Sequence, residues 1–433
     1  MNNSSSRLRS RLMRISVLVL SASLVFAFNT PATSATKLSG EIEFFHWRGE
    51  DRATLDTIIA AFVKKNPDVK ITQTIVTSAE HQATGTTKVL ANKEIALFSV
   101  WRDRYAAKEY LNAGILEDLS KEPFLKNFNK ASLLSAQIDG KSYAPFLHAL
   151  FNMPLYNTDI FAKEGLTPPR TWPGLLRLCK DLKAKGYVPM AWEGSVRGQA
   201  MQMINAMLAN SMPDPNTSYG ALAASGQVTE QWFMDGVAKK FEQMNKAGCF
   251  PDNGLGVTEA AANALFASGR AAIRPTGSFS MGAIKALNPA MSGKMRMMMI
   301  NSQDSSSKAK VEGIHNVQFG LAVNKMASPG DKAIAKAFIA HLSTPAMGYT
   351  YANGSSQHVT VNKVNYSGNL DLKNLEVWLN KKTLLAPRFQ PPTPKAIAAG
   401  VAIENMLIQI AGGAKTPAQA AAEFQPIIDQ ARK

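Results

Sequence analysis

Strand-like and helix-like apolar patterns alternate along the first hundred residues, and this alternation constrains the fold more than any other feature of the chain. Residues 42–47 and 95–100 are short and apolar enough to form buried strands, and residues 69–76 alternate as a third. Between the strands at residues 42–47 and 69–76, apolar residues recur at the spacing of one helix face: Leu55, Ile58, Ile59, Phe62 and Val63. Strands that alternate with helices pack as a sheet with helices on both faces, so the sequence predicts an α/β fold.

Tryptophan and charged residues directly follow several of the predicted strands. Such positions matter because ligands bind at the carboxyl ends of strands in α/β sheets. The candidates after residues 42–47, after residues 95–100 and after a further strand at 187–190 are Trp47, Arg48, Glu50, Asp51, Trp101, Asp103, Arg104, Trp192 and Glu193. For each tryptophan, simple packing into the core is the alternative interpretation, and it stays open here.

The N-terminal segment has the pattern of a secretory signal. Four arginines, at positions 7, 9, 11 and 14, precede an apolar stretch over residues 15–28, and Thr33-Ser34-Ala35 offers small residues to a signal peptidase. The apolar stretch is too short for a comfortable membrane span. We expect residues 1–35 to be a cleaved signal peptide, and the protein to be periplasmic.

The length and charge of the remaining chain limit its domain organisation and its partners. Residues 36–433 are too long for one compact core and suit two lobes. The net charge of +16 falls to +12 without the signal, because its four arginines are accompanied by no acidic residue. Lysines and arginines form no dense run, so we interpret the basic balance as a solvated surface and expect no nucleic-acid partner. An acidic ligand is the alternative.

The two cysteines, Cys179 and Cys249, would lie in an oxidising compartment. A disulfide between them and two separately buried thiols both fit the sequence. No histidine is near either cysteine in the sequence, so neither is expected to be catalytic.

Patterns for metal, phosphate or nucleophile chemistry are missing from the sequence. The six histidines do not pair at metal-ligand spacing. Neither a Gly-x-Ser-x-Gly elbow nor a Walker loop occurs. We therefore expect no metal, no cofactor and no enzymatic activity, although paired carboxylates of a glycoside hydrolase cannot be recognised from sequence spacing.

Five short segments, taken in order, carry a resemblance to a known family. They are Asp139-Gly-Lys-Ser-Tyr143, Leu155-Tyr-Asn-Thr-Asp159, Gly165-Leu-Thr-Pro-Pro-Arg-Thr-Trp172, Phe266-Ala-Ser-Gly-Arg-Ala-Ala-Ile273 with Gly277-Ser278-Phe279, and Gly320-Leu-Ala-Val-Asn-Lys325. The set resembles the bacterial extracellular solute-binding proteins that deliver sugars to ABC importers. It spans nearly all of the chain after residue 35.

The resemblance implies a two-lobed periplasmic binding protein fold of type II, with a mixed sheet flanked by helices in each lobe and a ligand cleft at the hinge. The chain would cross between lobes near His148, Pro275 and Asn324. Lobe 1 would then comprise residues 36–147 and 276–324, and lobe 2 would comprise residues 148–275 and 325–433.

The resemblance also implies a function. A small carbohydrate, such as a disaccharide or short oligosaccharide, would be held by hinge closure and passed to membrane permease subunits with a separate ATPase. Such a site uses aromatic faces and planar hydrogen-bonding groups. The resemblance adds His148, Gly277, Ser278 and Phe279 to the candidate ligand-binding residues at the strand ends. At the position of Phe279 the family usually has Trp. We expect a monomer. An acidic, uronate-type ligand and a secreted glycoside hydrolase are the alternatives.

Overall fold

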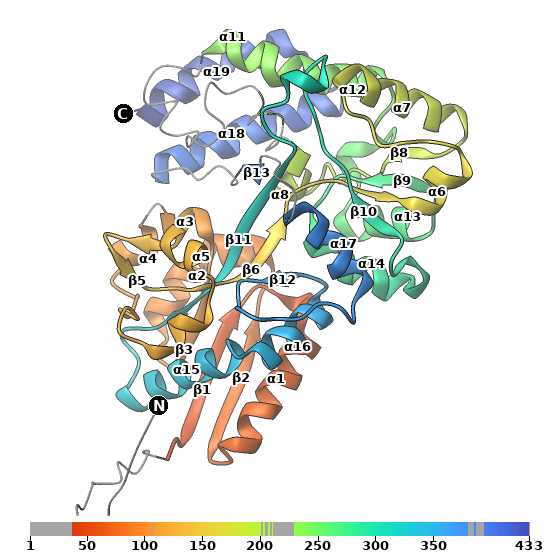
Figure 1. The fold of residues 1–433 in the computed structure, drawn as a ribbon. Helices are drawn as coiled ribbons and strands as arrows, with labels where there is room; N and C mark the ends of the chain where they lie inside the picture. Colours follow the sequence, from red (N-terminus) through yellow and green to blue (C-terminus); the bar gives the residue numbers. More distant parts are fainter. Residues whose placement is uncertain are drawn as a thin grey trace, which may run out of the picture. The chain divides into compact units, whose positions relative to one another are not determined.

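The computed structural model describes residues 37–106, 108–200, 202, 203, 207, 210, 229–379, 385, 386 and 394–432. The predicted signal peptide, residues 1–35, lies outside the described residues. The chain from Leu38 onward forms one unit that contains two main β-sheets and a short hairpin (Figure 1). Within the described ranges, no helix combines the length and the apolar character needed to cross a bilayer.

The first sheet has the strand order β12-β6-β11-β3-β1-β2, and β13 pairs with β11. Its strands are β1 (Gly40–His46), β2 (Val69–Ile75), β3 (Ile95–Val100), β6 (Phe146–Phe151), β11 (Gly313–Val323), β12 (His358–Val359) and β13 (Leu385–Ala386). β1 runs parallel to both β2 and β3, whereas β11 is antiparallel to β3 and β6. All six residues of β3 are buried, as expected of a strand covered on both faces.

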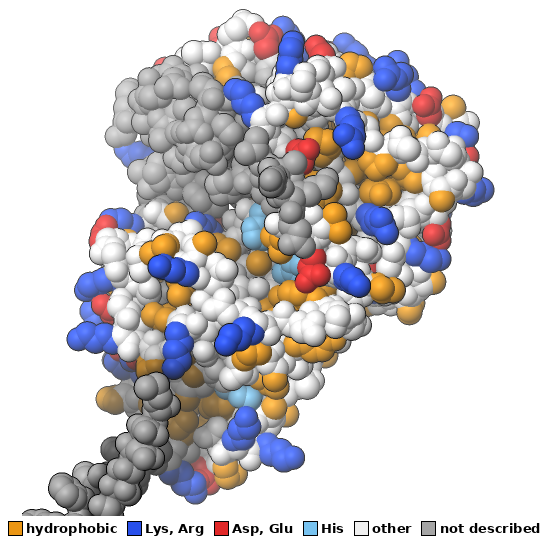
Figure 2. All heavy atoms as spheres, viewed as in Figure 1, with side chains coloured by type: hydrophobic (Ala, Val, Ile, Leu, Met, Phe, Trp, Pro, Cys, Tyr) orange, Lys and Arg blue, Asp and Glu red, His pale blue; other side chains and the backbone are white. Residues whose placement is uncertain are grey.

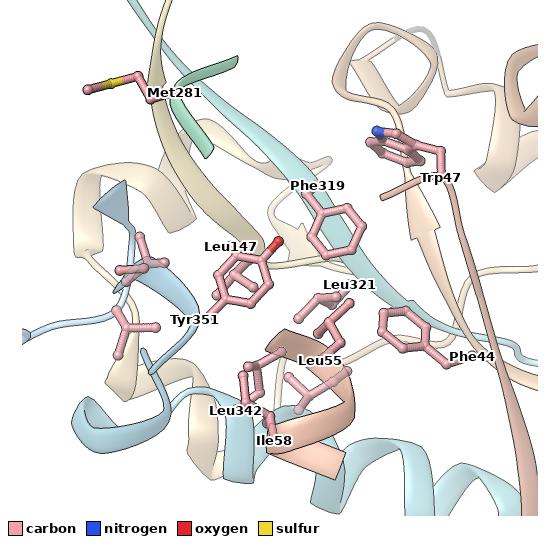
Figure 3. Packing of buried hydrophobic residues seen from close by; sticks show 14 of the residues in the cluster. Phe44, Trp47, Leu55, Ile58, Leu147, Met281, Phe319, Leu321, Leu342 and Tyr351 are labelled. Carbon is pink, nitrogen blue, oxygen red and sulfur yellow. The ribbon is translucent and has the colours of Figure 1, made fainter. Parts of the chain in front are cut away.

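Helices pack on this sheet through the apolar faces that the sequence predicts. In α1 (Arg52–Lys65), the buried side chains are Leu55, Ile58, Ile59 and Phe62. α15 (Pro329–Leu342) contacts β1, β3 and β11, and α16 (Pro345–Ser355) contacts α1. Figure 3 shows the resulting core, in which Leu55 and Ile58 meet Leu321 and Leu342.

The second sheet has the order β10-β7-β9-β8. Its strands are β7 (Leu155–Asn157), β8 (Val188–Met190), β9 (Ala271–Arg274) and β10 (Met295–Met297). β8 is parallel to β9, and the other two pairs are antiparallel. The methionine-rich segment is a core strand, since Met295, Met297 and the following Met298 are buried.

A second hydrophobic core lies between this sheet and a layer of helices. Its contacts include α7 (Trp172–Ala184) with β8, α12 (Lys239–Lys246) with α18 (Pro394–Ala411), and α18 with α19 (Pro417–Arg432). Thr171 caps α7, because its side chain accepts a hydrogen bond from the Gly174 amide. The structure joins Cys179 and Cys249 in a disulfide within this core, with Cα atoms 4.9 Å apart.

Shorter elements complete the described chain. Asp139 and Gly140 both have positive φ and form the turn of a hairpin that connects β4 (Gln137–Ile138) to β5 (Lys141–Ser142). The remaining α-helices are α2 (Ser78–Ala91), α3 (Arg102–Ala106), α4 (Glu109–Asn112), α5 (Lys130–Ser135), α6 (Thr158–Lys163), α8 (Arg197–Ala200), α11 (Glu230–Phe233), α13 (Glu259–Ala267), α14 (Met281–Leu287) and α17 (Leu370–Leu379). A π-helical stretch, Met234–Ala238, joins α11 to α12.

The lobe boundaries expected at residues 276 and 325 need correction. Residues 276–324 were assigned to lobe 1, but β10 within them pairs with β7 in the second sheet. Residues 325–433 were assigned to lobe 2, but α15 and α16 pack on the first sheet and its α1, and β12 pairs with β6. Apolar periodicity identifies an element but not the sheet that it joins, because that choice depends on contacts far apart in the chain.

Candidate functional site

A pocket of about 1010 Å³ is lined by elements that belong to both sheets. Side chains at the ends of β1 and β3 and on β6 and β11 face residues of α13, α14 and α16. The lining residues used below are Trp47, Arg48, Glu50, Asp51, Trp101, His148, Asn152, Gln202, Glu259 and Phe279. A pocket of this size, built from distant parts of the chain, is the site that we expect to bind a small molecule.

An aromatic pair stands at one side of the pocket. Because β1 and β3 are parallel neighbours, their carboxyl ends meet, and the rings of Trp47 and Trp101 stack with centroids 3.9 Å apart. The Trp47 ring also meets Phe319 edge to face at 5.3 Å. Trp47 is only 5% exposed whereas Trp101 is half-buried, so Trp101 offers the more accessible ring.

His81 holds this aromatic pair in place from behind. Its Nδ1 accepts a hydrogen bond from the Trp101 indole N–H at 3.0 Å, which leaves Nε2–H to donate to the Ser99 hydroxyl at 3.3 Å. Burial lowers the pKa of His81 to about 3. The imidazole is therefore neutral near pH 7, and its tautomer is fixed by these two partners.

Arg48 follows Trp47 and forms a buried ion-pair cluster. Its Nε and Nη2 donate to the two oxygens of Asp51, at 2.7 and 3.2 Å, and its Nη1 lies 2.7 Å from Glu50. Burial opposes the charged form of Asp51, but Arg48 outweighs it and holds the pKa of that carboxyl below its usual range. The guanidinium stays charged and presents a planar, fixed group at the pocket.

Tyr351 and His148 extend this cluster toward β6. The His148 Nε2–H donates to the Tyr351 hydroxyl at 2.5 Å, and Tyr351 in turn donates to Asp51 at 2.5 Å. The single Tyr351 O–H proton is donated to Asp51, so the Tyr351 oxygen can only accept from His148. Burial lowers the pKa of His148 to about 3, so its ring is neutral near pH 7. Figure 3 shows the Tyr351 ring beside Phe319, the residue that also supports Trp47.

Phe319 supports the site at some expense in backbone energy. Its φ of +60° lies in the left-handed region, which residues other than glycine seldom adopt. In this conformation its ring contacts Trp47, His148 and Tyr351 at once. Strained residues of this kind cluster at functional sites, because the surrounding structure holds them there.

Seven of the residues proposed from the sequence line this pocket: Trp47, Arg48, Glu50, Asp51, Trp101, His148 and Phe279. Asp103 and Arg104 do not line it. The Asp103 carboxylate accepts from the Arg104 amide, and the Arg104 guanidinium pairs with Glu109 at 2.7 Å. Their order in the sequence places them on α3, one turn beyond the strand end.

Gly277 and Ser278 are also outside the lining, and both are buried. The Ser278 hydroxyl accepts a hydrogen bond from the Phe151 amide at 3.1 Å. A Cβ on Gly277 would come within 2.6 Å of the Phe151 carbonyl oxygen. These two residues therefore join the loop after β9 to β6 and have a packing role.

Trp192 and Glu193, which the sequence analysis predicts to bind ligand, do not line this pocket. Both are fully buried, with Trp192 packed on Phe250 and Glu193 paired with the buried Arg274. Burial raises the pKa of Glu193 to about 7, against the pull of Arg274. Arg274 also donates to the Ala191 carbonyl and to Asn263, so the cluster ties the end of β8 to β9 and α13.

Four further residues of the site were missed by sequence reasoning. Glu259 lies in the first turn of α13, Asn152 follows β6, and Gln202 also lines the pocket. Tyr351 lies on α16, three hundred positions from its partner Asp51. Only Glu259 had a local signal, since Thr258 followed by an acidic residue is typical of a helix start.

Within the described ranges, no three His, Cys, Asp or Glu side chains are placed to hold a metal ion. The polar groups of the pocket lining include indole rings, an imidazole, amides, hydroxyls, carboxylates and one guanidinium. Such groups bind polar molecules through stacking and hydrogen bonds.

Comparison with known proteins agrees with this architecture. Residues 47–349 match the family model of the bacterial extracellular solute-binding proteins, so the chain belongs to that family and the predicted resemblance is confirmed. Among curated proteins, the multiple sugar-binding protein of Streptococcus mutans is 25% identical over 285 residues. That match covers 64% of this chain and 66% of the relative, slightly less than two thirds of its length.

Solved structures show the same fold. The solute-binding protein RafE in complex with raffinose superposes with a TM-score of 0.74 at 21% identity, over 90% of this chain and 100% of that chain. A chitin oligosaccharide binding protein gives a TM-score of 0.76 at 21% identity, over 91% and 99%. The predicted type II solute-binding fold, a mixed α/β structure, is confirmed.

Proposed function

We propose that this protein is the substrate-binding component of a carbohydrate ABC importer, which captures a disaccharide or a short oligosaccharide. The observation that carries the proposal is the stacked Trp47–Trp101 pair beside the Arg48–Asp51 cluster, in a pocket lined by both sheets. A sugar ring presents an apolar C–H face and an edge of hydroxyls. An accessible indole suits the former, and a fixed, charged hydrogen-bonding group suits the latter.

The two-sided lining suggests how binding is coupled to delivery. A ligand that contacts the ends of β1 and β3 and also α13 bridges the two sides of the pocket. It therefore stabilises the closed state, in which both sides contact the ligand at once. In the proposed cycle, that closed state docks on membrane permease subunits, while a separate ATPase supplies the energy. The binding protein itself acts as a periplasmic monomer, exported by the signal at residues 1–35, and performs no chemistry on the sugar.

A thermal-shift screen followed by calorimetry tests the proposal. Neutral mono-, di- and oligosaccharides are each added to residues 36–433, and we expect at least one to raise the melting temperature. Ligand at about 100 times its Kd stabilises a protein by about 2.7 kcal/mol. If no neutral or charged sugar stabilises the protein, the proposal is wrong. Release of reducing ends from a bound sugar would instead favour the hydrolase.

A further inference from the structure

The charge of the pocket is opposite to the charge of the chain. The whole sequence has a formal charge of +16, and Figure 2 shows lysines and arginines scattered over the visible face. Among the described residues that line the pocket, however, the charged groups are one guanidinium, Arg48, and three carboxylates, Glu50, Asp51 and Glu259. The lining therefore carries a formal charge of −2 with all four groups ionised.

The one guanidinium in this lining already has anionic partners. The three nitrogens of Arg48 each contact a carboxylate: Nε and Nη2 contact Asp51, and Nη1 contacts Glu50. Three of its five N–H groups are engaged in this way. The two adjacent carboxylates also offset its charge, so Arg48 attracts an anionic ligand less than an unpaired guanidinium would.

Acceptor oxygens form part of the unused hydrogen-bonding capacity of the pocket lining. Within the part of the chain that the structure describes, the Glu259 carboxylate makes no hydrogen bond and no ion pair. Burial raises the pKa of Glu259, Arg274 and Arg48 oppose the rise, and the Glu50 carboxylate adds to it. The surroundings of Glu259 therefore disfavour its negative charge, because the two guanidinium groups offset burial only in part.

Asn152 provides an independent sign of a missing donor. It is 2% exposed and lines the pocket, yet its Oδ1 has no hydrogen-bond partner among the residues that the structure describes. The orientation of this amide follows from Gln202, whose Nε2 donates to the Gly198 carbonyl, so that its Oε1 must accept from Asn152 Nδ2. A buried acceptor without a donor is costly, and a donor on a ligand would satisfy it.

We propose that the pocket selects sugars that carry a protonated amino group, with the ammonium at Glu259, and discriminates against sugars that carry a carboxylate. The proposal rests on the proposed function, because it names the class of carbohydrate for that same site. An ammonium brings three donors and a positive charge to a lining that has spare acceptors and excess negative charge. Hydroxyls alone would satisfy the acceptors but would leave the charge uncompensated.

Matched sugar sets measured by calorimetry test this selectivity. The sets are glucose, glucosamine and glucuronate, the corresponding galactose and mannose series, and the β-1,4-linked disaccharides cellobiose, its diamino analogue and cellobiouronic acid. In each set that binds, we expect the amine to bind about tenfold tighter than the neutral sugar, which corresponds to about 1.4 kcal/mol. The carboxylate member should bind most weakly.

The variant Glu259→Gln assigns the effect to one residue. It keeps the shape of the side chain and removes the charge, so the amine should lose most of its tenfold advantage while neutral sugars change little. Glu94→Gln is the matched control, because it removes the same charge from an exposed side chain outside the pocket. The control should retain the preference for amines.

Each other outcome overturns a defined part of the argument. Neutral sugars that bind as tightly as amines refute the proposed selectivity but leave the proposed function intact. Carboxylates that bind most tightly also refute it and support the uronate ligand. An amine preference unchanged in Glu259→Gln refutes the assignment to Glu259. If no member of any set binds, the proposed function fails together with this inference.

Discussion

The ends of β1 and β8 carry the same local sequence pattern, a tryptophan followed by a charged residue, in opposite environments. Trp47 and Arg48 lie at the pocket, where the Trp47 ring stacks on the more accessible Trp101. Trp192 and Glu193 are fully buried, and no part of either lines the pocket. The pattern therefore marks the end of a strand, while the covering segments decide whether that end faces a ligand or the core.

Glycines explain how the end of β8 becomes covered. A Cβ on Gly194 would lie 2.5 Å from the Gly254 carbonyl oxygen, and a Cβ on Gly254 would lie 3.0 Å from the Trp192 ring. The absence of side chains at both positions lets the loop around Gly254 lie directly on Trp192. In contrast, the end of β3 is followed by the half-buried Trp101, which leaves the pocket open.

The largest effect on stability is expected at the end of β8, where Trp192 is buried. Trp192→Ala should lower the free energy of unfolding by about 3–5 kcal/mol, because it leaves a cavity beside Phe250. Sugar affinity of the folded fraction should not change. Chemical denaturation and calorimetry on the same variant measure both quantities. A large loss of affinity with little loss of stability would restore Trp192 to the ligand site.

The disulfide belongs to the same buried region and should matter next. Replacing Cys179 and Cys249 together by serine should cost about 2–4 kcal/mol of stability, since the bridge closes a long loop between α7 and the residue after α12. Melting curves of the oxidised protein and the double variant, with and without ligand, give the loss. We expect the ligand-induced shift to be the same in both proteins. A smaller shift in the variant would mean that the second core also shapes the pocket.

On the pocket side, Trp101→Ala should mainly change binding. Affinity for the sugar should fall about tenfold, or about 1.4 kcal/mol, because the accessible ring is lost. Stability of the ligand-free protein should fall by about 1 kcal/mol, from the lost stack on Trp47 and the lost bond to His81. Trp101→Phe keeps a ring but no N–H, so it should recover much of the affinity. Equal affinity in all three proteins would remove Trp101 from the site.

A further comparison concerns the pH dependence of stability. Burial lowers the pKa of His46 to about 4 and the pKa values of His81 and His148 to about 3, below the ordinary value of about 6.5. The unfolded chain then binds more protons, so these residues contribute full stability above pH ~6.5 and lose it as pH falls toward 3–4. Each adds at most about 1.4 kcal/mol per pH unit to the slope.

Denaturation between pH 7 and pH 4 checks this expectation. His148→Gln should flatten the slope, because it removes one titrating ring at the pocket. His341→Gln is the comparison variant, since its ring is only partly buried and lies outside the pocket. An unchanged slope in His148→Gln would show that His148 is not held neutral in the folded protein.

Much of the architecture was predictable because its signals are local. The apolar stripe of α1 and the strands β1, β2 and β3 depend on residues a few positions apart, and the structure contains all of them. The lobe boundaries were not predictable in this way. β10 joins the second sheet and α15 packs on the first, each opposite to the expected assignment. Strand order and helix packing depend on partners hundreds of residues away, which no local pattern specifies.

The candidate site divides in the same way. Trp47, Arg48 and Asp51 follow a strand directly, and the rule that ligands meet strand ends was enough to propose them. Glu259 and Asn152 reach the pocket only through the fold, and so does the contact of Tyr351 with Asp51 behind it. The loop around Gly254 covers Trp192. By itself, the sequence determined which segments are strands and helices and which residues end them. The tertiary structure alone decided which of those ends are open, because exposure depends on the chain segment that packs against each one.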